Sequence, residues 1–269
     1  MLCKRYSGIS DMSDEVLIKV EKVFQNFAIE EGAIEIIKDV SFEVRSNSFN
    51  IIYGASGSGK STLLNILSGL QTPSKGRVLF KGQDVYAFSP DELAHFRANQ
   101  IGIVYQSNYW VQSLNVLENV AIPLYFLGYT RSSAMQKALS ALEKIDMQSY
   151  AKKYPILLSG GEQQRVAVAR AIVNDPMFII ADEPTGSLDS KNGDKVMDLL
   201  RSAHSDTKRT IILVTHNMEY LPLADNLLHI QDGVVQNPDS QSVQTISSEM
   251  ITSLKQRLDK FAAAKEEEQ

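Results

Sequence analysis

Residues 54–61 read Gly-Ala-Ser-Gly-Ser-Gly-Lys-Ser, directly after the apolar run 49–53 and at the start of a helical pattern over residues 60–70. Glycines at this spacing before a lysine and a serine are typical of a phosphate-binding P-loop. Glycine lets consecutive backbone N–H groups turn inward, and a helix N-terminus adds a positive dipole end. The stretch predicts a cradle for nucleotide phosphates, formed by Gly54, Ala55, Ser56, Gly57, Ser58, Gly59, Lys60, Ser61 and Thr62.

A second element of the predicted phosphate site is the run Phe-Ile-Ile-Ala-Asp-Glu-Pro at residues 178–184. Lys60 is expected to reach the β- and γ-phosphates, and the Ser61 hydroxyl to bind Mg²⁺ together with Asp182. Glu183 is then placed to polarise the attacking water as a general base. The alternative is a buried strand that ends in two solvated acids.

His216 follows the apolar run 211–215, again where a strand is expected to end. There it could hydrogen-bond the γ-phosphate and hold Glu183 and the water in line. A histidine at a strand end is more often structural, so this role depends on the other motifs.

Apolar runs of strand length alternate with helical patterns along most of the chain, which predicts an α/β fold with a largely parallel sheet. Ligands of such sheets lie at the carboxyl ends of the strands, where the polar residues above are found. Helical spacing of Ala134, Ala138, Leu139, Leu142 and Ile145 predicts an inserted α-helical subdomain. The expected strands are residues 17–23, 40–44, 49–53, 101–105, 177–181 and 211–214.

The amino-acid composition and net charge argue against nucleic acid as the partner of this chain. The chain has 269 residues, is 43% hydrophobic and carries a formal net charge of -5, which fits a globular protein without the basic stripe of a nucleic-acid binder. Its one cysteine, Cys3, cannot form an internal disulfide and favours a reducing compartment. The most apolar stretch, residues 111–129, is interrupted by polar residues and Pro123, so we expect any membrane work to require another chain.

Residues 158–165 read Leu-Ser-Gly-Gly-Glu-Gln-Gln-Arg, which closely resembles the signature motif of ATP-binding cassette (ABC) proteins. Gln106 resembles the Q-loop glutamine of that family, residues 187–189 its D-loop and His216 its switch histidine. The resemblance covers about residues 17–235. It implies a P-loop NTPase of the ABC type with a RecA-like core, an antiparallel β subdomain and an inserted α-helical subdomain.

The same resemblance implies site residues and domain limits. Gln106 would join the catalytic residues Glu183 and His216 and the Mg²⁺ ligands Ser61 and Asp182. A second γ-phosphate cradle would act on the ATP of another copy of the chain in a two-fold head-to-tail dimer, with the contacts Ser159, Gly160, Gly161, Glu162 and Asp189. A serine that merely caps a helix is the alternative. The expected domains are a tail (1–15), the nucleotide-binding domain (16–236) with its helical insert (about 107–160), and a linker with an amphipathic helix (237–269).

Adenine recognition in the family uses an aromatic ring before the early strands. Phe27 stands where tyrosine is usual, and it can still stack because stacking needs only a π face. Phe24 is a nearby competitor.

The chain resembles most closely the ATPases of the MacB and LolD type, with the FtsE division ATPase as a close relation, through residues 54–61, 117–123 and 181–189. Glu162, Tyr105 and the run 46–48 depart from the usual pattern without touching a phosphate ligand. The implied partner is a membrane permease of the MacB, LolC, LolE or FtsX type, which places the chain at the cytoplasmic face of the membrane. An FtsE-like regulator of a cell-wall hydrolase and a soluble DNA-repair or ribosomal ATPase are the rival functions.

The permease is expected to dock near Gln106. Tyr109 and Trp110 follow at once and are candidates for its hydrophobic socket. An aromatic pair inside the core of the insert is the alternative.

Overall fold

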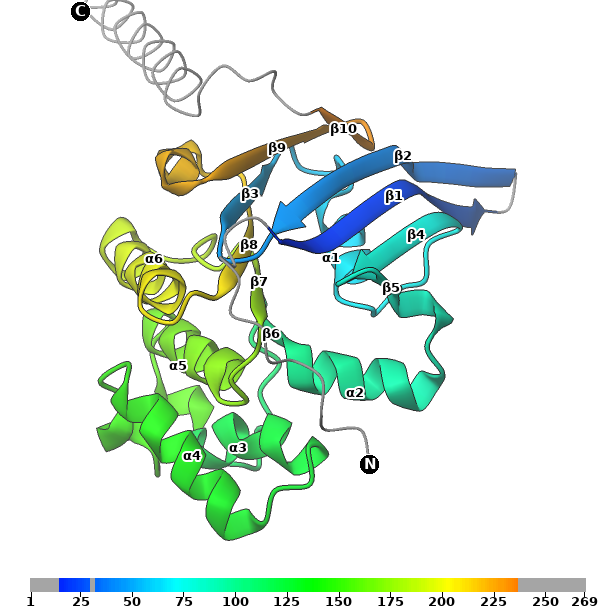
Figure 1. The fold of residues 1–269 in the computed structure, drawn as a ribbon. Coiled ribbons are helices and arrows are strands. Elements are labelled where there is room, and N and C mark those ends of the chain that lie inside the picture. Colours follow the sequence, from blue (N-terminus) through cyan, green and yellow to red (C-terminus); the bar gives the residue numbers. More distant parts are fainter. Residues whose placement is uncertain (1–14, 30–31, 237–269) are drawn as a thin grey trace, which may run out of the picture.

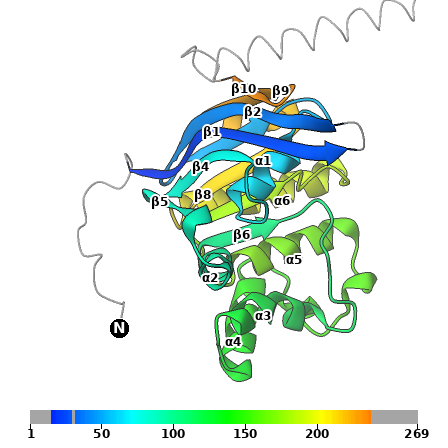
Figure 2. The same cartoon turned by 90° about the vertical axis from the view of Figure 1, so that its right-hand side faces the viewer.

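The computed structural model describes residues 15–29 and 32–236. Most of the predicted N-terminal tail, with Cys3, and the predicted C-terminal linker and amphipathic helix at 237–269 lie outside the described residues. Within the described part, the chain forms two sheets and a group of helices. Both views place the antiparallel sheet and helices α3 and α4 at opposite ends, with the second sheet between them (Figures 1 and 2).

The central sheet has six strands in the order β10-β9-β3-β8-β7-β6. All neighbours pair in parallel except β10 with β9. Its strands are β3 (Phe49–Tyr53), β6 (Ile101–Val104), β7 (Phe178–Asp182), β8 (Thr210–Thr215), β9 (Asn226–Gln231) and β10 (Val234–Gln236). A parallel sheet is covered on both faces, which explains why these strands are apolar at nearly every position instead of at every second one.

Two apolar cores cover the two faces of this sheet. Ile180 and Ile212 face the first core, which contains α1 (Lys60–Leu67) and the antiparallel sheet. Their neighbours Ile179 and Ile211 face the second core, formed with α5 (Gly160–Ile172) and α6 (Ser190–Ser205). The carboxyl ends of β3, β7 and β8 are thereby fixed side by side.

The antiparallel sheet has the order β2-β1-β4-β5. Its first two strands are much longer than predicted, because β1 spans Val16–Ile29 and β2 spans Gly32–Arg45. The register shifts several times between them, and Lys22 and Asp39 have positive φ, so the apolar alternation is interrupted. The far half of the hairpin is exposed and has no buried face from which a strand could be predicted. The remaining strands are β4 (Lys75–Phe80) and β5 (Gln83–Asp84).

A third core belongs to the inserted helices α3 (Val116–Phe126) and α4 (Arg131–Glu143), which pack on α5. Ala134, Ala138, Leu142 and Ile145 are buried there as the spacing predicts, but Leu139 is exposed. Leu139 follows Ala138 directly and therefore points away from the buried stripe. The other helices are α2 (Pro90–Gln100) and the short 3-10 turns η1 (Val85–Ala87), η2 (Gln148–Tyr150), η3 (Pro155–Leu157) and η4 (Met218–Leu223).

Other predicted boundaries were wrong by one to three residues. Helix α1 ends at Leu67 instead of residue 70, because Gly69 adopts a φ of 69° and the N–H of Leu70 bonds back to Asn65. Strand β6 ends at Val104 and not at Tyr105. Within the described residues, no helix is long and apolar enough to span a bilayer.

Candidate nucleotide site

A cavity of about 600 Å³ lies at the carboxyl ends of the parallel strands, beside the loop that follows β3. Residues from the hairpin, the phosphate loop, the segment after β6 and the end of β7 meet there. The cavity is lined by Phe27, Ile34, Ile36, Ser56, Gly57, Gly59, Lys60, Ser61, Thr62, Gln106, Asp182 and Glu183. Tertiary structure thus brings together residues that are up to 156 positions apart in the sequence.

The phosphate loop is shaped around its own lysine. The Lys60 ammonium is buried and donates hydrogen bonds to the carbonyl oxygens of Gly54, at 3.0 Å, and Ala55, at 2.8 Å. Gly59 has a φ of 104°, and a Cβ there would come within 2.9 Å of the Ile37 side chain. A buried cation at the N-terminus of α1 makes this loop suitable for an anion.

Asp182 lies opposite the loop, at the end of β7. Its carboxylate is hydrogen-bonded to the Ser61 side chain, and burial, followed by the negative charge of Glu183, raises its pKa above the usual value. The nearby charge of Lys60 and the Ser61 hydrogen bond oppose this rise only in part. The carboxylate therefore lacks a full counter-charge in the protein alone.

Glu183 and His216 are held together at the same sheet edge. The His216 Nδ1 atom lies 3.0 Å from the Glu183 Oε2 atom. The Glu183 N–H donates to the Val214 carbonyl oxygen at 2.9 Å, although its φ of 43° is unusual for a residue other than glycine. His216 is 60% exposed in its side chain, so its ring stands at the open rim of the site.

Of the two candidate aromatic rings, the structure places Phe27 at the cavity. Phe27 pairs with Ile34 across the hairpin, and both side chains remain exposed, at 43% and 48%. Phe24 pairs with Lys75 instead, whose ammonium lies over its ring. Ile34 and Ile36 extend the apolar end of the cavity, and sequence reasoning missed both because they fall on the interrupted part of β2.

The signature residues belong to another surface. Ser159 caps α5, accepting from the Glu162 N–H at 3.4 Å, while the Glu162 Oε2 atom accepts from the Ser159 N–H and Oγ, each at 2.8 Å. Hydrogen bonds from Tyr150 and Ser159 hold the pKa of Glu162 below its usual range. Ser159, Gly160, Gly161 and Glu162 do not line the cavity around Lys60.

The predicted D-loop residue lies near the signature. Asp189 caps α6 through the Asn192 N–H at 3.0 Å and also accepts from the Asn192 side chain at 2.7 Å. A Cβ on Gly161 would meet that Asn192 side chain at 2.8 Å. The predicted signature and D-loop residues therefore form one surface.

Gly233, which sequence reasoning did not single out, supports the phosphate loop from behind. Its N–H donates to the Ser58 carbonyl oxygen at 3.2 Å, and its carbonyl accepts from Lys38 at 2.8 Å. A Cβ at this position would lie 2.2 Å from the Ile36 carbonyl oxygen. The Asp-Gly pair at 232–233 was a possible turn signal, but its contact with the loop is a product of the fold.

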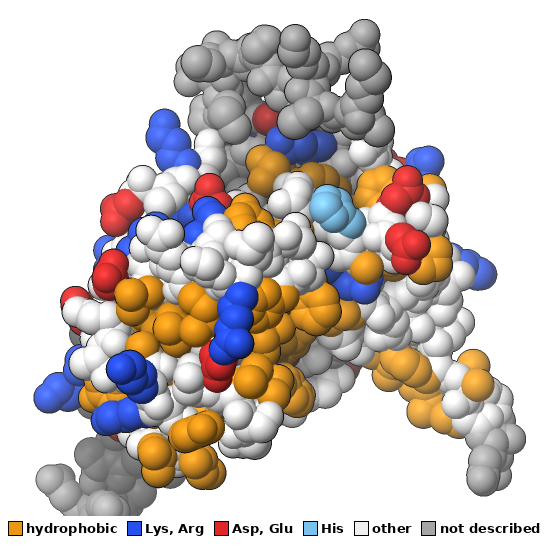
Figure 3. Space-filling view, turned by 90° about the horizontal axis from the view of Figure 1, so that it is seen from below, with side chains coloured by type: hydrophobic (Ala, Val, Ile, Leu, Met, Phe, Trp, Pro, Cys, Tyr) orange, Lys and Arg blue, Asp and Glu red, His pale blue; other side chains and the backbone are white. Residues whose placement is uncertain are grey.

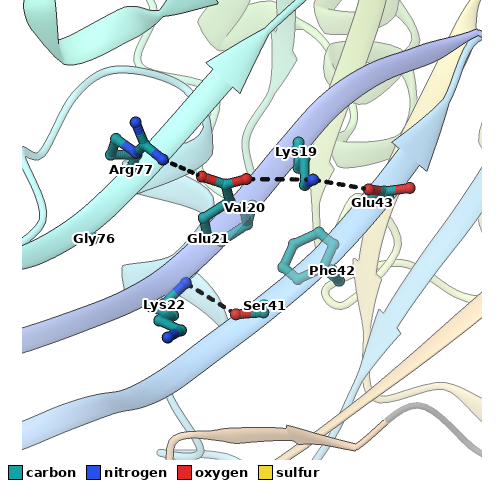
Figure 4. A pocket seen from close by; sticks show the side chains of 9 residues that line it. All are labelled: Lys19, Val20, Glu21, Lys22, Ser41, Phe42, Glu43, Gly76 and Arg77. Atoms are coloured by element: carbon teal, nitrogen blue, oxygen red, sulfur yellow. Dashed lines mark hydrogen bonds and ion pairs between the residues drawn. The ribbon is translucent and has the colours of Figure 1, made fainter. Parts of the chain in front are cut away.

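A second cavity lies on the outer face of the antiparallel sheet (Figure 4). Four of its five charged side chains form ion pairs, and Glu21 lies between Arg77, at 2.7 Å, and Lys19, at 3.3 Å. Lys19 also contacts Glu43 at 3.5 Å. These charges are already paired, so this cavity is a weaker candidate than the one around Lys60.

Comparisons with known proteins identify the family and the fold. Residues 37–186 match the family model described as "ABC transporter". An uncharacterized ABC transporter ATP-binding protein of Thermotoga maritima is 39% identical over 227 residues, which cover 84% of this chain and 97% of the relative. The macrolide export ATP-binding/permease protein MacB of Brucella melitensis is 40% identical over 83% of this chain, which spans only 34% of that protein's length.

Among solved structures, the ATP-binding cassette MJ0796, in a dimeric post-hydrolysis state bound to ADP and Pi, is 35% identical with a TM-score of 0.77. The match covers 82% of this chain and 97% of that one. The fold predicted from the resemblance, a P-loop NTPase of the ABC type with an antiparallel sheet and inserted helices, is thereby confirmed. The chain belongs to the ABC transporter family as an ATP-binding domain, and its relatives include proteins of the MacB type.

Proposed function

We propose that this chain hydrolyses ATP as a two-fold head-to-tail dimer and thereby drives a membrane permease of the MacB or LolCDE type. One observation carries the proposal: the chain has a lysine-bearing phosphate cavity and, on a separate surface, the capped N-terminus of α5 at Ser159. Each is half of a γ-phosphate site. Two copies related by two-fold symmetry would bring each half against the other half of its partner.

In this proposal the adenine ring stacks on Phe27 and the phosphates lie in the loop around Lys60. The apolar lining from Phe27, Ile34 and Ile36 is at one part of the cavity, and the polar lining from the loop and strand ends forms the rest. This division suits a molecule with an aromatic base and an anionic tail. The related cassette MJ0796 is a dimer bound to ADP and Pi, which supports nucleotide binding by a dimer of this chain.

The residues Ser61, Gln106 and Asp182 fit a bound Mg²⁺. Hydroxyl, amide and carboxylate oxygens are the hard ligands this ion prefers, and the raised pKa of Asp182 indicates a carboxylate that lacks a counter-charge. Within the described residues, there is no cluster of three or more His, Cys, Asp and Glu side chains that could hold a metal by itself. We therefore infer that ATP phosphates share the ion, which supplies positive charge against the phosphate oxygens.

Hydrolysis is assigned to side chains at the strand ends. Glu183 accepts a proton from the attacking water, and His216 holds the Glu183 carboxylate from the rim. Gln106 lines the same cavity and responds to the terminal phosphate. Ser159 and the first N–H groups of α5 stabilise that phosphate from the partner subunit.

The permease is proposed to dock on the insert near Gln106, at the cytoplasmic face of the membrane. Figure 3 shows hydrophobic side chains gathered on the underside of the molecule as drawn in Figure 1, where α3 and α4 lie. Tyr109 is 73% exposed and fits the docking role, whereas Trp110 packs inward. Other exposed apolar side chains of the segment 107–160 are Val111, Tyr125, Phe126, Tyr129, Leu139, Tyr154, Ile156 and Leu157.

An FtsE-like regulator of a cell-wall hydrolase would use the same ATPase and differ only in its membrane partner. The 40% identity to MacB favours the exporter, although the permease part of that protein has no counterpart in the matched residues. Affinity purification of the chain from a detergent extract of its native membranes, with sequencing of the integral membrane protein that remains bound, distinguishes the two.

The ATPase proposal is tested with Glu183→Gln, which keeps the shape of the site and removes the base. We expect this variant to form a dimer with Mg·ATP in light scattering and to retain unhydrolysed nucleotide. Lys60→Ala, the control, is expected to lose ATP binding and to stay monomeric. A Glu183→Gln protein that neither pairs nor occludes ATP, even with its membrane partner present, contradicts the proposal, as does wild-type turnover in that variant.

A further inference from the structure

We propose that Trp110 is a positioning residue that ties the segment carrying Gln106 to the signature loop. Through this connection, a nucleotide bound in a subunit's own phosphate cavity determines the position of the signature loop at Ser159, which the subunit presents to its partner. The inference rests on the proposed dimer and names the side chains that connect its two half-sites within one chain.

The first link is a hydrogen bond between two side chains that the catalytic assignment does not use. The Trp110 Nε1 atom donates to the Gln163 Oε1 atom at 2.8 Å. The amide nitrogen of the same glutamine donates to the Leu158 carbonyl oxygen at 3.1 Å. Gln163 thus uses both ends of its amide, one on Trp110 and one on the residue that precedes Ser159.

The second link fixes the Trp110 ring itself. The Arg170 guanidinium lies 4.4 Å from the ring centroid and donates to the Asn108 carbonyl oxygen at 2.7 Å. Burial lowers the pKa of Arg170 to about 10, so the group is still a cation at neutral pH. A partly buried cation over an indole face is a favourable and directional contact.

A third contact holds the other side of the Gln106 segment. The Gln164 side chain, which is buried, donates to the Tyr105 carbonyl oxygen at 3.0 Å. Residues 105–110 are therefore fastened to α5 at three points, and Gln106 lies between two of them. A displacement of Gln106 toward a terminal phosphate is expected to move α5, whose N-terminus is the signature cradle.

Trp110 is distinguished from the other two contacts by what it binds. Gln164 and Arg170 hold backbone carbonyls, which any residue at 105 or 108 would supply. Of these three contacts, it is the Trp110 indole that reaches Gln163 and, through it, the signature loop. Its ring packs against the core under the central sheet and also against the core of the insert, so it spans the two bodies that must move together.

The test is a double-mutant cycle in the Glu183→Gln background. Trp110→Phe keeps an aromatic ring under Arg170 and removes the N–H, while Gln163→Met keeps length and removes both hydrogen bonds. Gln148→Met, at an exposed position of the same insert, is the matched control. Three quantities are measured: the ATP dissociation constant of the monomer, the midpoint of Mg·ATP-driven dimerisation, and the Hill coefficient of turnover in the hydrolysis-competent protein.

We expect Trp110→Phe to leave the monomer affinity for ATP within about twofold and to shift the dimerisation midpoint by about five- to tenfold, within the usual range of coupling between sites. The Hill coefficient should fall toward one. The double variant should lose no more than the more affected single variant, because both changes break one path. Gln148→Met should behave as the parent does.

Three results overturn the inference. An unchanged dimerisation midpoint in Trp110→Phe does so, as do fully additive effects in the double variant. The inference is also overturned if Trp110→Phe lowers the melting temperature and weakens ATP binding by the monomer by the same factor as it shifts the dimerisation midpoint. That result would mark Trp110 as a merely structural residue. If the Glu183→Gln parent itself fails to dimerise with Mg·ATP, the proposed function fails and the inference with it, whereas a normal parent with an unaffected Trp110→Phe removes the inference alone.

Discussion

The Nδ1 atom of His216 lies 3.0 Å from the Oε2 atom of Glu183. The two residues follow β8 and β7, which pair in parallel register, so their side chains emerge at one edge of the sheet. Glu183 is held at a φ of 43°, a conformation that costs a residue other than glycine about 1–3 kcal/mol and persists where the surroundings enforce it. The fold thus spends stability to keep this carboxylate beside the histidine.

Replacing that histidine tests the relationship. We expect His216→Ala to lower kcat about a hundredfold or more, in the range of a lost general acid–base arrangement, with little change in the affinity for ATP. The reason is that the imidazole holds the Glu183 carboxylate and contributes no wall to the cavity. Steady-state turnover and equilibrium binding of a fluorescent ATP analogue measure the two quantities. His95→Ala, an exposed histidine on α2, is the control, and a kcat loss shared by both variants would contradict this role.

The proposed stacking of the adenine ring on Phe27 is tested by substitution. Phe27→Ala removes the stacking surface, which is worth about 1–3 kcal/mol for a base on an aromatic ring, or roughly 5- to 150-fold in affinity. ATP and ADP should weaken alike, because they share the base, and Phe27→Tyr should bind as the parent does. Calorimetric titration gives both constants. Phe24→Ala should leave affinity unchanged, and a larger loss there than at Phe27 would reverse the assignment.

The raised pKa of Asp182 predicts that the free energy of unfolding depends on pH. Burial and then the charge of Glu183 raise the pKa of this carboxyl above 3.8, so the fold favours its protonated form. That contribution is present in full below the unfolded pKa and is lost as the pH rises through the folded pKa. Asp182→Asn keeps the shape without the charge. We therefore expect it to melt at a higher temperature than wild type at pH 7.5, without nucleotide or metal, and by a margin that shrinks as the pH falls toward 3.8.

Asp182→Asn should also lose Mg²⁺-dependent ATP turnover. Greater stability of the nucleotide-free protein would then accompany loss of activity. Differential scanning calorimetry and an ATPase assay follow the two effects. Asp198→Asn removes an exposed carboxylate from α6 and is expected to change neither. A metal-free Asp182→Asn protein that melts below wild type at pH 7.5 would show that this carboxylate has the counter-charge we infer it lacks.

Gly233 offers a test of the support behind the phosphate loop. Gly233 and Gly82 have nearly equal φ, 81° and 79°, so an alanine at either position costs about 1–2 kcal/mol in backbone strain. Only at Gly233 does the new Cβ meet backbone, 2.2 Å from the Ile36 oxygen, while at Gly82 nothing lies within 4 Å. Gly233→Ala should therefore also raise the KM for ATP by displacing Ser58. Equal KM values in the two variants would show that the loop does not depend on this turn.

Much of the site was predictable because its motifs are local. A loop of glycines before Lys60, and acids directly after an apolar run, need only the neighbouring residues to define a strand, a turn and a helix. Parallel strands buried on both faces give continuous apolar runs, so β3, β6, β7 and β8 were predicted to within one residue at each end, whereas β9 and β10 were not predicted. The long hairpin was not, because register shifts interrupt its alternation and its far half is exposed.

The sequence by itself indicated the family and the phosphate loop, since each depends on the spacing of residues within a short segment, whereas the order of the strands in the sheet came only from the structure. Only the tertiary structure decided that Phe27 and not Phe24 faces the cavity, that Gly233 supports the phosphate loop, and that Trp110 turns inward while Tyr109 stays exposed. Those outcomes depend on which distant surfaces pack together. Packing is a property of the whole chain, and no local pattern encodes it.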